Sequence, residues 1–486
     1  MRLAHRLVIV AGACGLAAAT GAAGVVAASA GAGAGAARSA GAPVAASPLA
    51  DVTVHPDAIR VGAVRASGPT STAQCESDWH VACYTPQQVR QAYNLPSLYA
   101  HGITGKGSTI VIVDSYGSPT IKHDLGVFDS AFGISAPPSF KIITPAGKLP
   151  KWKNNSDMPG WAGETTLDVE WAHTIAPSAN IVLVETPVDE TEGVQGFPQI
   201  VSAEKYVLKH YHADVISQSF SATEQTFPSK AAVEALRGAN YAAEKDHVTV
   251  LAASGDSGAA DVELNGSTYY LHPVTSWSDS DPLVTGVGAT QLHLDAQGNA
   301  TSPASVWNDT YSKNANLFTT GSSQDSPDSS GGGKSILFAR PSYQNGVASV
   351  VGKARGVPDI SMSGACDGSV DIYSSFPGAP AGWTQECGTS EATPEFAGIV
   401  ALAAQYAGHP LGLINPALYT MSAHRASYPG LVPVTKGNNT VTFKQNGKWY
   451  TIKGFSASSG GSYSLATGVG TVNALYFVPE LAKLAG

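Results

Sequence analysis

Short runs of consecutive apolar residues recur along the first two thirds of the chain. Such runs are typical of strands that are buried on both faces of a sheet. They are separated by stretches with helical patterning, near residues 163–175, 198–211 and 230–245. Strands that alternate with helices predict an α/β fold, in which helices cover both faces of a parallel sheet. The predicted strands lie at residues 109–114, 180–185, 215–220, 248–253 and 283–291.

The two ends of the chain differ from this pattern. Arg2 and Arg6 precede an apolar, Ala/Gly-rich run, which is the layout of a secretory signal peptide over residues 1–30. Residues 31–74 are rich in Ala, Gly, Ser and Pro and predict a flexible leader or short pro-segment. Residues 75–486 then form a single large domain, with a long apolar helix at 389–407 and a turn-rich tail from about residue 427.

Composition narrows the possible partners. The net charge is -9, and no cluster of Lys and Arg suggests a nucleic-acid surface. After the signal peptide, no segment has the ~18 uninterrupted apolar residues of a transmembrane helix. We therefore expect a secreted, extracellular protein that contacts neither nucleic acid nor a membrane.

Four cysteines follow the signal peptide, and an even number in an exported chain indicates disulfide bonds. Four cysteines allow three pairings. The short spacings favour Cys75–Cys83 and Cys366–Cys387.

Three segments carry candidate chemistry. Ser390 begins the long apolar helix, where backbone N–H groups favour negative charge. Glu164 and Asp168 are four residues apart and project from one helix face, so they can share a proton. Asp256 lies between glycines directly after a buried strand. Each has a plain interpretation, respectively a helix cap, a solvated acidic face and an Asx-turn, and taken singly each plain interpretation is the better one.

Together, and in this order along the chain, the three segments resemble the motifs of the sedolisin family of serine-carboxyl peptidases. The resemblance extends from about Cys75 to Asn473. Further matching segments are residues 85–93, 102–107, 217–220, 329–333, 355–359 and 466–470.

The resemblance implies a subtilisin-like fold and a secreted endopeptidase that acts in acid through an acyl-enzyme. It makes Ser390 the nucleophile, Glu164 the general base and Asp168 the residue that orients this base. Asp256, when protonated, is the donor to the oxyanion. The chemistry is consistent, because a glutamate with a reference pKa near ~4.3 keeps a basic fraction at about pH 4, whereas histidine is protonated there.

We consider two other functions for this chain. A subtilisin-like Asp/His/Ser triad would use Asp114, but the His-Gly-Thr-His segment that should follow it is missing, and His123 and His173 have no neighbouring glycine. An inactive secreted binding protein on a peptidase scaffold is the other alternative. The presence of all four residues of the catalytic type argues against it.

The chain departs from the family pattern in two ways. Only the short stretch of residues 31–74 separates the signal peptide from the domain, where family members carry a long pro-domain. The family also implies a calcium site in the C-terminal tail, but Pro433 and Ser464 occupy the positions of its two aspartates. Calcium prefers anionic oxygen ligands, so we expect weak calcium binding or none. No other cofactor is expected.

Overall fold

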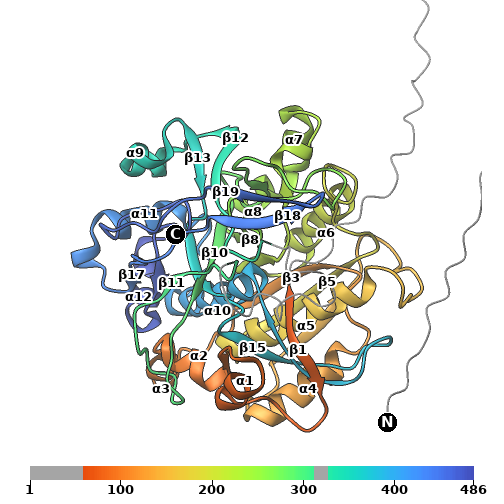
Figure 1. The fold of residues 1–486 in the computed structure, drawn as a ribbon. Helices are drawn as coiled ribbons and strands as arrows, with labels where there is room; N and C mark the ends of the chain where they lie inside the picture. Colours follow the sequence, from red (N-terminus) through yellow and green to blue (C-terminus); the bar gives the residue numbers. More distant parts are fainter. Residues whose placement is uncertain (1–57, 311–326, 486) are drawn as a thin grey trace, which may run out of the picture. The chain divides into compact units, whose positions relative to one another are not determined.

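A mostly parallel sheet forms the centre of the computed structural model, which describes residues 58–310 and 327–485 (Figure 1). Only β11 joins the sheet antiparallel to its neighbour, and β14 (Ile360–Ser363) pairs with β10 as a further parallel strand. This confirms the predicted sheet. Along the sheet the strands follow the order β11 (Ser305–Val306), β10 (Thr285–Gln291), β8 (Thr249–Ala253), β6 (Val215–Gln218), β3 (Thr109–Ser115), β5 (Asn180–Thr186) and β4 (Phe140–Ile143).

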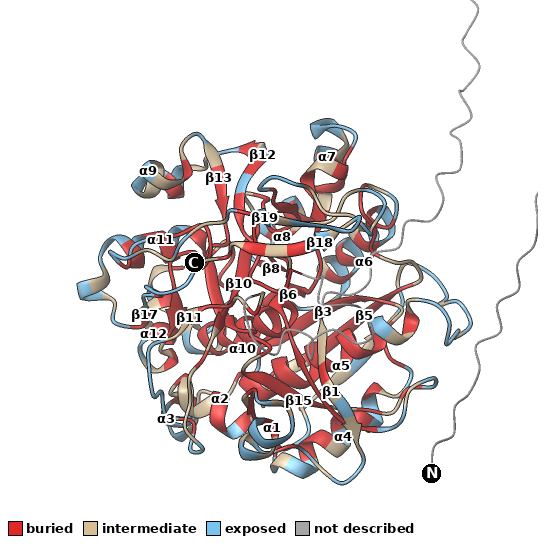
Figure 2. Cartoon of the chain, viewed as in Figure 1, coloured by how far each residue is buried: buried red, intermediate tan, exposed pale blue. Residues whose placement is uncertain are grey.

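Helices cover both faces of this sheet, as predicted. Helices α5 (Met158–Ile175) and α10 (Thr389–Ala407) pack together on one face, and α6 (Phe197–His210) and α8 (Gly238–Lys245) pack on the other. Alternate side chains of strand β3 enter the hydrophobic cores on the two faces of the sheet. Ile110 and Ile112 enter the core on the α5 and α10 side, whereas Val111 and Val113 enter the opposite core. Figure 2 shows this sheet as buried.

A second sheet has the order β1 (Ile59–Arg65), β16 (Gly382–Cys387), β15 (Ser369–Ser374) and β2 (Cys83–Tyr84). Here the structure differs from the expected leader, because the chain is folded from Ala58 rather than from Cys75. Strand β1 pairs antiparallel with β16, and α1 (Thr72–Trp79) follows it. The burial of Val61 and the ladder with β16, whose residues lie more than 300 positions away, hold this segment. The predicted signal peptide and residues 31–57 lie outside the described residues.

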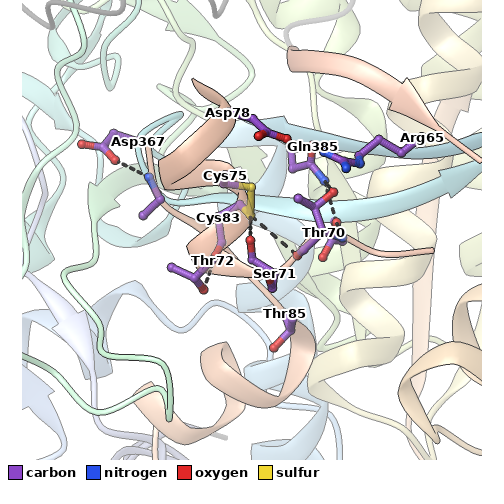
Figure 3. Close-up of a disulfide and its surroundings, with 12 residues drawn as sticks. Arg65, Thr70, Ser71, Thr72, Cys75, Asp78, Cys83, Thr85, Asp367 and Gln385 are labelled. Carbon is purple, nitrogen blue, oxygen red and sulfur yellow. Dashed lines mark hydrogen bonds and ion pairs between the residues drawn. A yellow bond between two sulfur atoms is a disulfide. The ribbon is translucent and has the colours of Figure 1, made fainter. Parts of the chain in front are cut away.

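Both predicted disulfides are present. Cys75–Cys83 joins α1 to β2, and Figure 3 shows it beside Thr70, Ser71 and Thr72. Cys366–Cys387 joins the loop after β14 to the last residue of β16. The second disulfide therefore holds the strand that leads into Gly388 and α10.

Other segments refine the prediction. The helical stretch predicted at 230–245 is two helices, α7 (Lys230–Leu236) and α8, which are separated at Arg237. Arg237 forms an ion pair with Asp281. No helix in the described part of the chain has the length and apolarity to cross a membrane. The remaining elements are α2 (Pro86–Ala92), α3 (Leu95–Ala100), α4 (Ile121–Phe132), β7 (Ala222–Thr223), β9 (Ser276–Trp277), β12 (Gly333–Ala339), α9 (Ala348–Val351), β13 (Ala354–Val357), α11 (Asn415–Ala423), β17 (Leu431–Val432), β18 (Val441–Gln445), β19 (Lys448–Ile452), β20 (Thr471–Val472) and α12 (Ala474–Leu484), with short 3-10 turns between some of them.

We predict that replacing Cys366 and Cys387 by alanine lowers the free energy of unfolding by about 3 kcal/mol, because the open chain gains entropy when this loop is released. Removing Cys75–Cys83 should cost less, since its sequence separation is 8 rather than 21. Urea unfolding of the two double variants and the parent measures the difference. An equal or larger loss for the shorter loop would contradict the prediction.

Candidate active site

The residues singled out in the sequence lie at the carboxyl-terminal edge of the central sheet, where functional groups of parallel α/β folds gather. Helix α5 carries Glu164 and Asp168, the turn after β8 carries Asp256, and the first turn of α10 carries Ser390. Two further side chains come from neighbouring strand ends, Asp114 from β3 and Ser219 from the segment after β6. All of these residues are buried.

Ser219 links two of the candidate residues. Its hydroxyl donates to Asp168 Oδ1 at 2.7 Å and lies 3.5 Å from the main-chain carbonyl oxygen of Ser390. The acid of α5 and the first turn of α10 are therefore held around one small side chain. Sequence analysis assigned residues 217–220 only to a matching strand and gave Ser219 no part in the site.

Asp256 is fixed against the start of α10. Its Oδ1 accepts hydrogen bonds from the Thr389 N–H and hydroxyl, each at 2.7 Å. Gly388 is required here, because its φ is 128° and a Cβ on it would lie 2.3 Å from Asp256 Oδ2. That Oδ2 is buried and has no hydrogen-bond partner among the described residues. One oxygen of Asp256 thus anchors the residue before Ser390, and the other is free to face a ligand.

Burial determines the protonation of Asp256. Desolvation raises its pKa to about 8, although the Thr389 hydrogen bonds act in the opposite direction, and the charges of Asp328 and Asp261 raise it further. In acid the carboxyl is therefore neutral. Since Oδ1 accepts from Thr389, the proton on Oδ2 makes this atom a hydrogen-bond donor.

A second group of acids lies along α5 and β3. Burial, with the nearby charges of Asp114 and Glu164, raises the pKa of Asp168 well above its usual range. Burial also raises the pKa of Asp114 to about 7. The carboxyls of Asp114 and Asp168 interact with each other, and burial favours the protonated form of each in acid. Asp114, which a subtilisin-like triad would have used, thus supports the acid pair of α5.

Glu164 is fully buried, and its Oε2 accepts a hydrogen bond of 3.0 Å from the backbone N–H of Ala58. The segment that leads into β1 therefore reaches the carboxylate of α5. Beside Glu164 lies an open hollow of about 560 Å³, lined among others by Arg60, Phe376 and Glu386. This hollow gives space next to the acid for part of a ligand.

Among the described residues, no imidazole forms a hydrogen bond with Ser390 Oγ. The Ser390 hydroxyl is buried and has no hydrogen-bond partner in the described part of the chain. His173 is engaged elsewhere, 3.4 Å from Asp129 and 3.0 Å from the Ser135 carbonyl oxygen. His123 is exposed and packs edge-on against Tyr373. Within residues 58–310 and 327–485, no group of three His, Cys, Asp or Glu side chains is arranged to hold a metal ion.

Comparison with known proteins gives concordant results. The model of the Subtilase family matches residues 153–427. Kumamolisin of a Bacillus species is 30% identical over 369 residues, 74% of this chain and 58% of its own length. Sedolisin of a Pseudomonas species is 28% identical over 397 residues, 80% of this chain and 60% of its own. The chain thus spans about three fifths of these curated relatives.

A solved structure has the same fold. The structure of Pseudomonas sedolisin, described as a serine-carboxyl proteinase complexed with pseudo-iodotyrostatin, superposes with a TM-score of 0.65. The match covers 83% of this chain and 99% of the other at 23% sequence identity. It confirms the predicted subtilisin-like architecture.

We predict that the fold is most stable in acid. The pKa of Asp256 is about 8 and that of Asp114 about 7, whereas an unfolded aspartate has a pKa near ~3.9. Between about pH 4 and pH 8 the folded state thus binds more protons than the unfolded state, so the free energy of unfolding falls as the pH rises. Thermal unfolding from pH 3 to pH 8 measures this trend. In Asp256→Asn the decrease should be smaller, and a melting temperature that rises from pH 4 to pH 7 would contradict the prediction.

Proposed function

Because this chain belongs to the subtilase family, and within it to the sedolisin group, we propose that it is a secreted serine-carboxyl endopeptidase that hydrolyses peptide bonds in acid. Ser390 is the nucleophile, Glu164 the general base, Asp168 the residue that orients the base, and Asp256 the acid that stabilises the oxyanion. The observation that carries the proposal is the buried Asp256, whose free Oδ2 lies beside Gly388 at the start of the helix that carries Ser390.

The proposed reaction begins with the attack of Ser390 Oγ on the carbonyl carbon of the scissile bond, while Glu164 accepts the hydroxyl proton. The carbonyl oxygen becomes an oxyanion and accepts a hydrogen bond from protonated Asp256. When the tetrahedral intermediate collapses, Glu164 returns its proton to the amine that leaves, and an ester remains on Ser390. Water then attacks this ester by the same path in reverse, which releases the acid product and restores the serine.

The electrostatics of the site favour acid. Asp256 donates to an oxyanion only while it is protonated, and its pKa of about 8 keeps it so below neutral pH. Asp168 interacts with Ser219, Asp114 and Glu164, so a proton on this group can be held close to the base. The base itself must be ionised, which sets the acid limit of activity. The proposed mechanism thus requires a pH at which Glu164 is ionised while Asp256 is protonated.

Secretion is part of the same proposal. The N-terminal sequence has the layout of a signal peptide, and the two disulfides suit an oxidising compartment. Substrates are proteins or extended peptides, which can add as a strand beside residues 219–221, the segment that follows β6.

We predict that Ser390→Ala lowers hydrolysis of casein at about pH 4 by about 10³-fold or more, because the acyl-enzyme cannot form. Glu164→Gln should have a similar effect, since the amide keeps the shape but accepts no proton. His123→Ala, in which an exposed imidazole is removed, should retain the parent activity. A loss of activity in the His123 variant would favour a histidine-based mechanism. Equal inactivity of the parent and Ser390→Ala on all peptides would favour the binding-protein alternative.

A pair of variants at Asp256 tests the oxyanion role. Asp256→Ala removes the donor and should lower kcat by about 10²–10³-fold. Asp256→Asn keeps an N–H donor that does not ionise, so it should retain more activity and lose the alkaline limb of the pH–rate profile. Measurement of kcat from pH 3 to pH 9 for both variants distinguishes these results. Equal losses with an unchanged alkaline limb would exclude Asp256 as the group that titrates.

A further inference from the structure

One arginine holds together three separate parts of the C-terminal tail. The guanidinium of Arg425 donates from Nη1 to the carbonyl oxygen of Leu431 at 3.1 Å, and from Nη2 to the carbonyl oxygen of Ser462 at 2.8 Å. Nη2 also donates to the carbonyl oxygen of Val469 and lies 3.4 Å from the hydroxyl of Ser422. The acceptors are thus the oxygens of strand β17, of the loop before Ser464 and of the turn that precedes β20.

These are the same segments in which the family resemblance implies a calcium ion, and the residues present do not fit that ion. Leu431 lies two positions before Pro433, and Ser462 lies two positions before Ser464. Pro433 has no donor oxygen in its side chain, and a Cβ on Gly461 would lie 3.0 Å from its ring. The hydroxyl of Ser464 is occupied by the turn that it caps, where it accepts from the N–H groups of Ala466 and Thr467. Neither of the two positions supplies an anionic ligand.

The charge at Arg425 is not neutralised by an acid. No ion pair joins it to a carboxylate among the described residues, and the acceptors of its hydrogen bonds are carbonyl and hydroxyl oxygens. Burial lowers its pKa to about 10, so the group stays cationic at acid and neutral pH. Three backbone carbonyl oxygens thus surround a half-buried cation, and carbonyl oxygens are also ligands of a bound calcium ion.

We propose that the Arg425 guanidinium is a covalently attached substitute for the tail calcium ion, so that the tail is held without a metal. A guanidinium suits this place, because it has a fixed charge and several N–H donors that can each reach a different carbonyl. The substitution is coherent with the exchange of the two aspartates. A guanidinium carries one positive charge where Ca²⁺ carries two, so it needs fewer carboxylates nearby to balance its charge.

The tail segment that Arg425 holds is connected by hydrogen bonds to the candidate active site. The loop between Ser462 and Val469 includes Ala466, whose carbonyl oxygen accepts from the Ser330 hydroxyl at 3.2 Å. The preceding residue, Ser329, donates its N–H to the carbonyl oxygen of Asp256 at 2.9 Å. The tail thus contacts Ser330, and the neighbouring Ser329 contacts the turn that carries Asp256, the proposed oxyanion donor.

The first test is thermal unfolding of the full chain with Ser390→Ala, which prevents self-digestion, in 1 mM EDTA and in excess CaCl₂. We expect the same melting temperature in both solutions. In the same background, Arg425→Gln should lower the melting temperature by about 5 °C, and Arg425→Lys by less, since the ammonium keeps the charge. Arg340→Gln is the matched control, because Arg340 also donates to a backbone carbonyl but lies outside the tail; it should have little effect.

The reverse exchange is a second, independent test. The variant Arg425→Ala with Pro433→Asp and Ser464→Asp restores both carboxylates and removes the guanidinium. Its melting temperature should rise when CaCl₂ is added, whereas that of the parent should not. The proposal is overturned if EDTA lowers the melting temperature of the parent by several degrees, if Arg425→Gln is as stable as the parent, or if the triple variant folds but does not respond to calcium. None of these readouts depends on proteolysis, so they stand or fall apart from the proposed function.

Discussion

The cost of placing charge out of water governs the candidate active site. Asp114, Asp168 and Asp256 are buried at one edge of the sheet, and no Lys or Arg forms an ion pair with any of them among the described residues. Desolvation is the first cause of the raised pKa of each. The fold thus raises the pKa of carboxyl groups that would be ionised at the surface, and this favours their protonated form.

The parallel sheet was predictable because each of its long strands is a continuous apolar run, and this pattern is local to the sequence. Strands β3, β5 and β8 therefore begin and end within a residue of the predicted positions. Strand β1 was not predictable, because its stability comes from a ladder with β16 on the far side of the chain rather than from its own residues. The division of residues 230–245 into two helices was not predicted either, and it lies at Arg237, whose ion-pair partner Asp281 is distant in the sequence.

The four candidate site residues were found through their types, their spacing and their order, and the structure brings Asp168, Asp256 and the first turn of α10 into contact through Ser219 and Thr389. What the sequence did not reveal is how these residues are supported. Ser219 and Thr389 are small polar residues in segments that had another interpretation, and Asp114 was considered only for a subtilisin-like triad, which the missing histidine segment argued against. The contacts of Ser219, Thr389 and Asp114 depend on which strand and helix ends lie close together, and a local sequence pattern does not show this.

The hydrogen bond from the Ala58 N–H to Glu164 makes the candidate base sensitive to whether the chain continues before Ala58. In the uncut chain, the backbone nitrogen of Ala58 is a neutral amide that donates to the carboxylate of Glu164. If the chain were cut directly before this residue, the same nitrogen would become an ammonium group with a full positive charge. Such a cut would therefore change the electrostatic environment of Glu164 without any change of side chain.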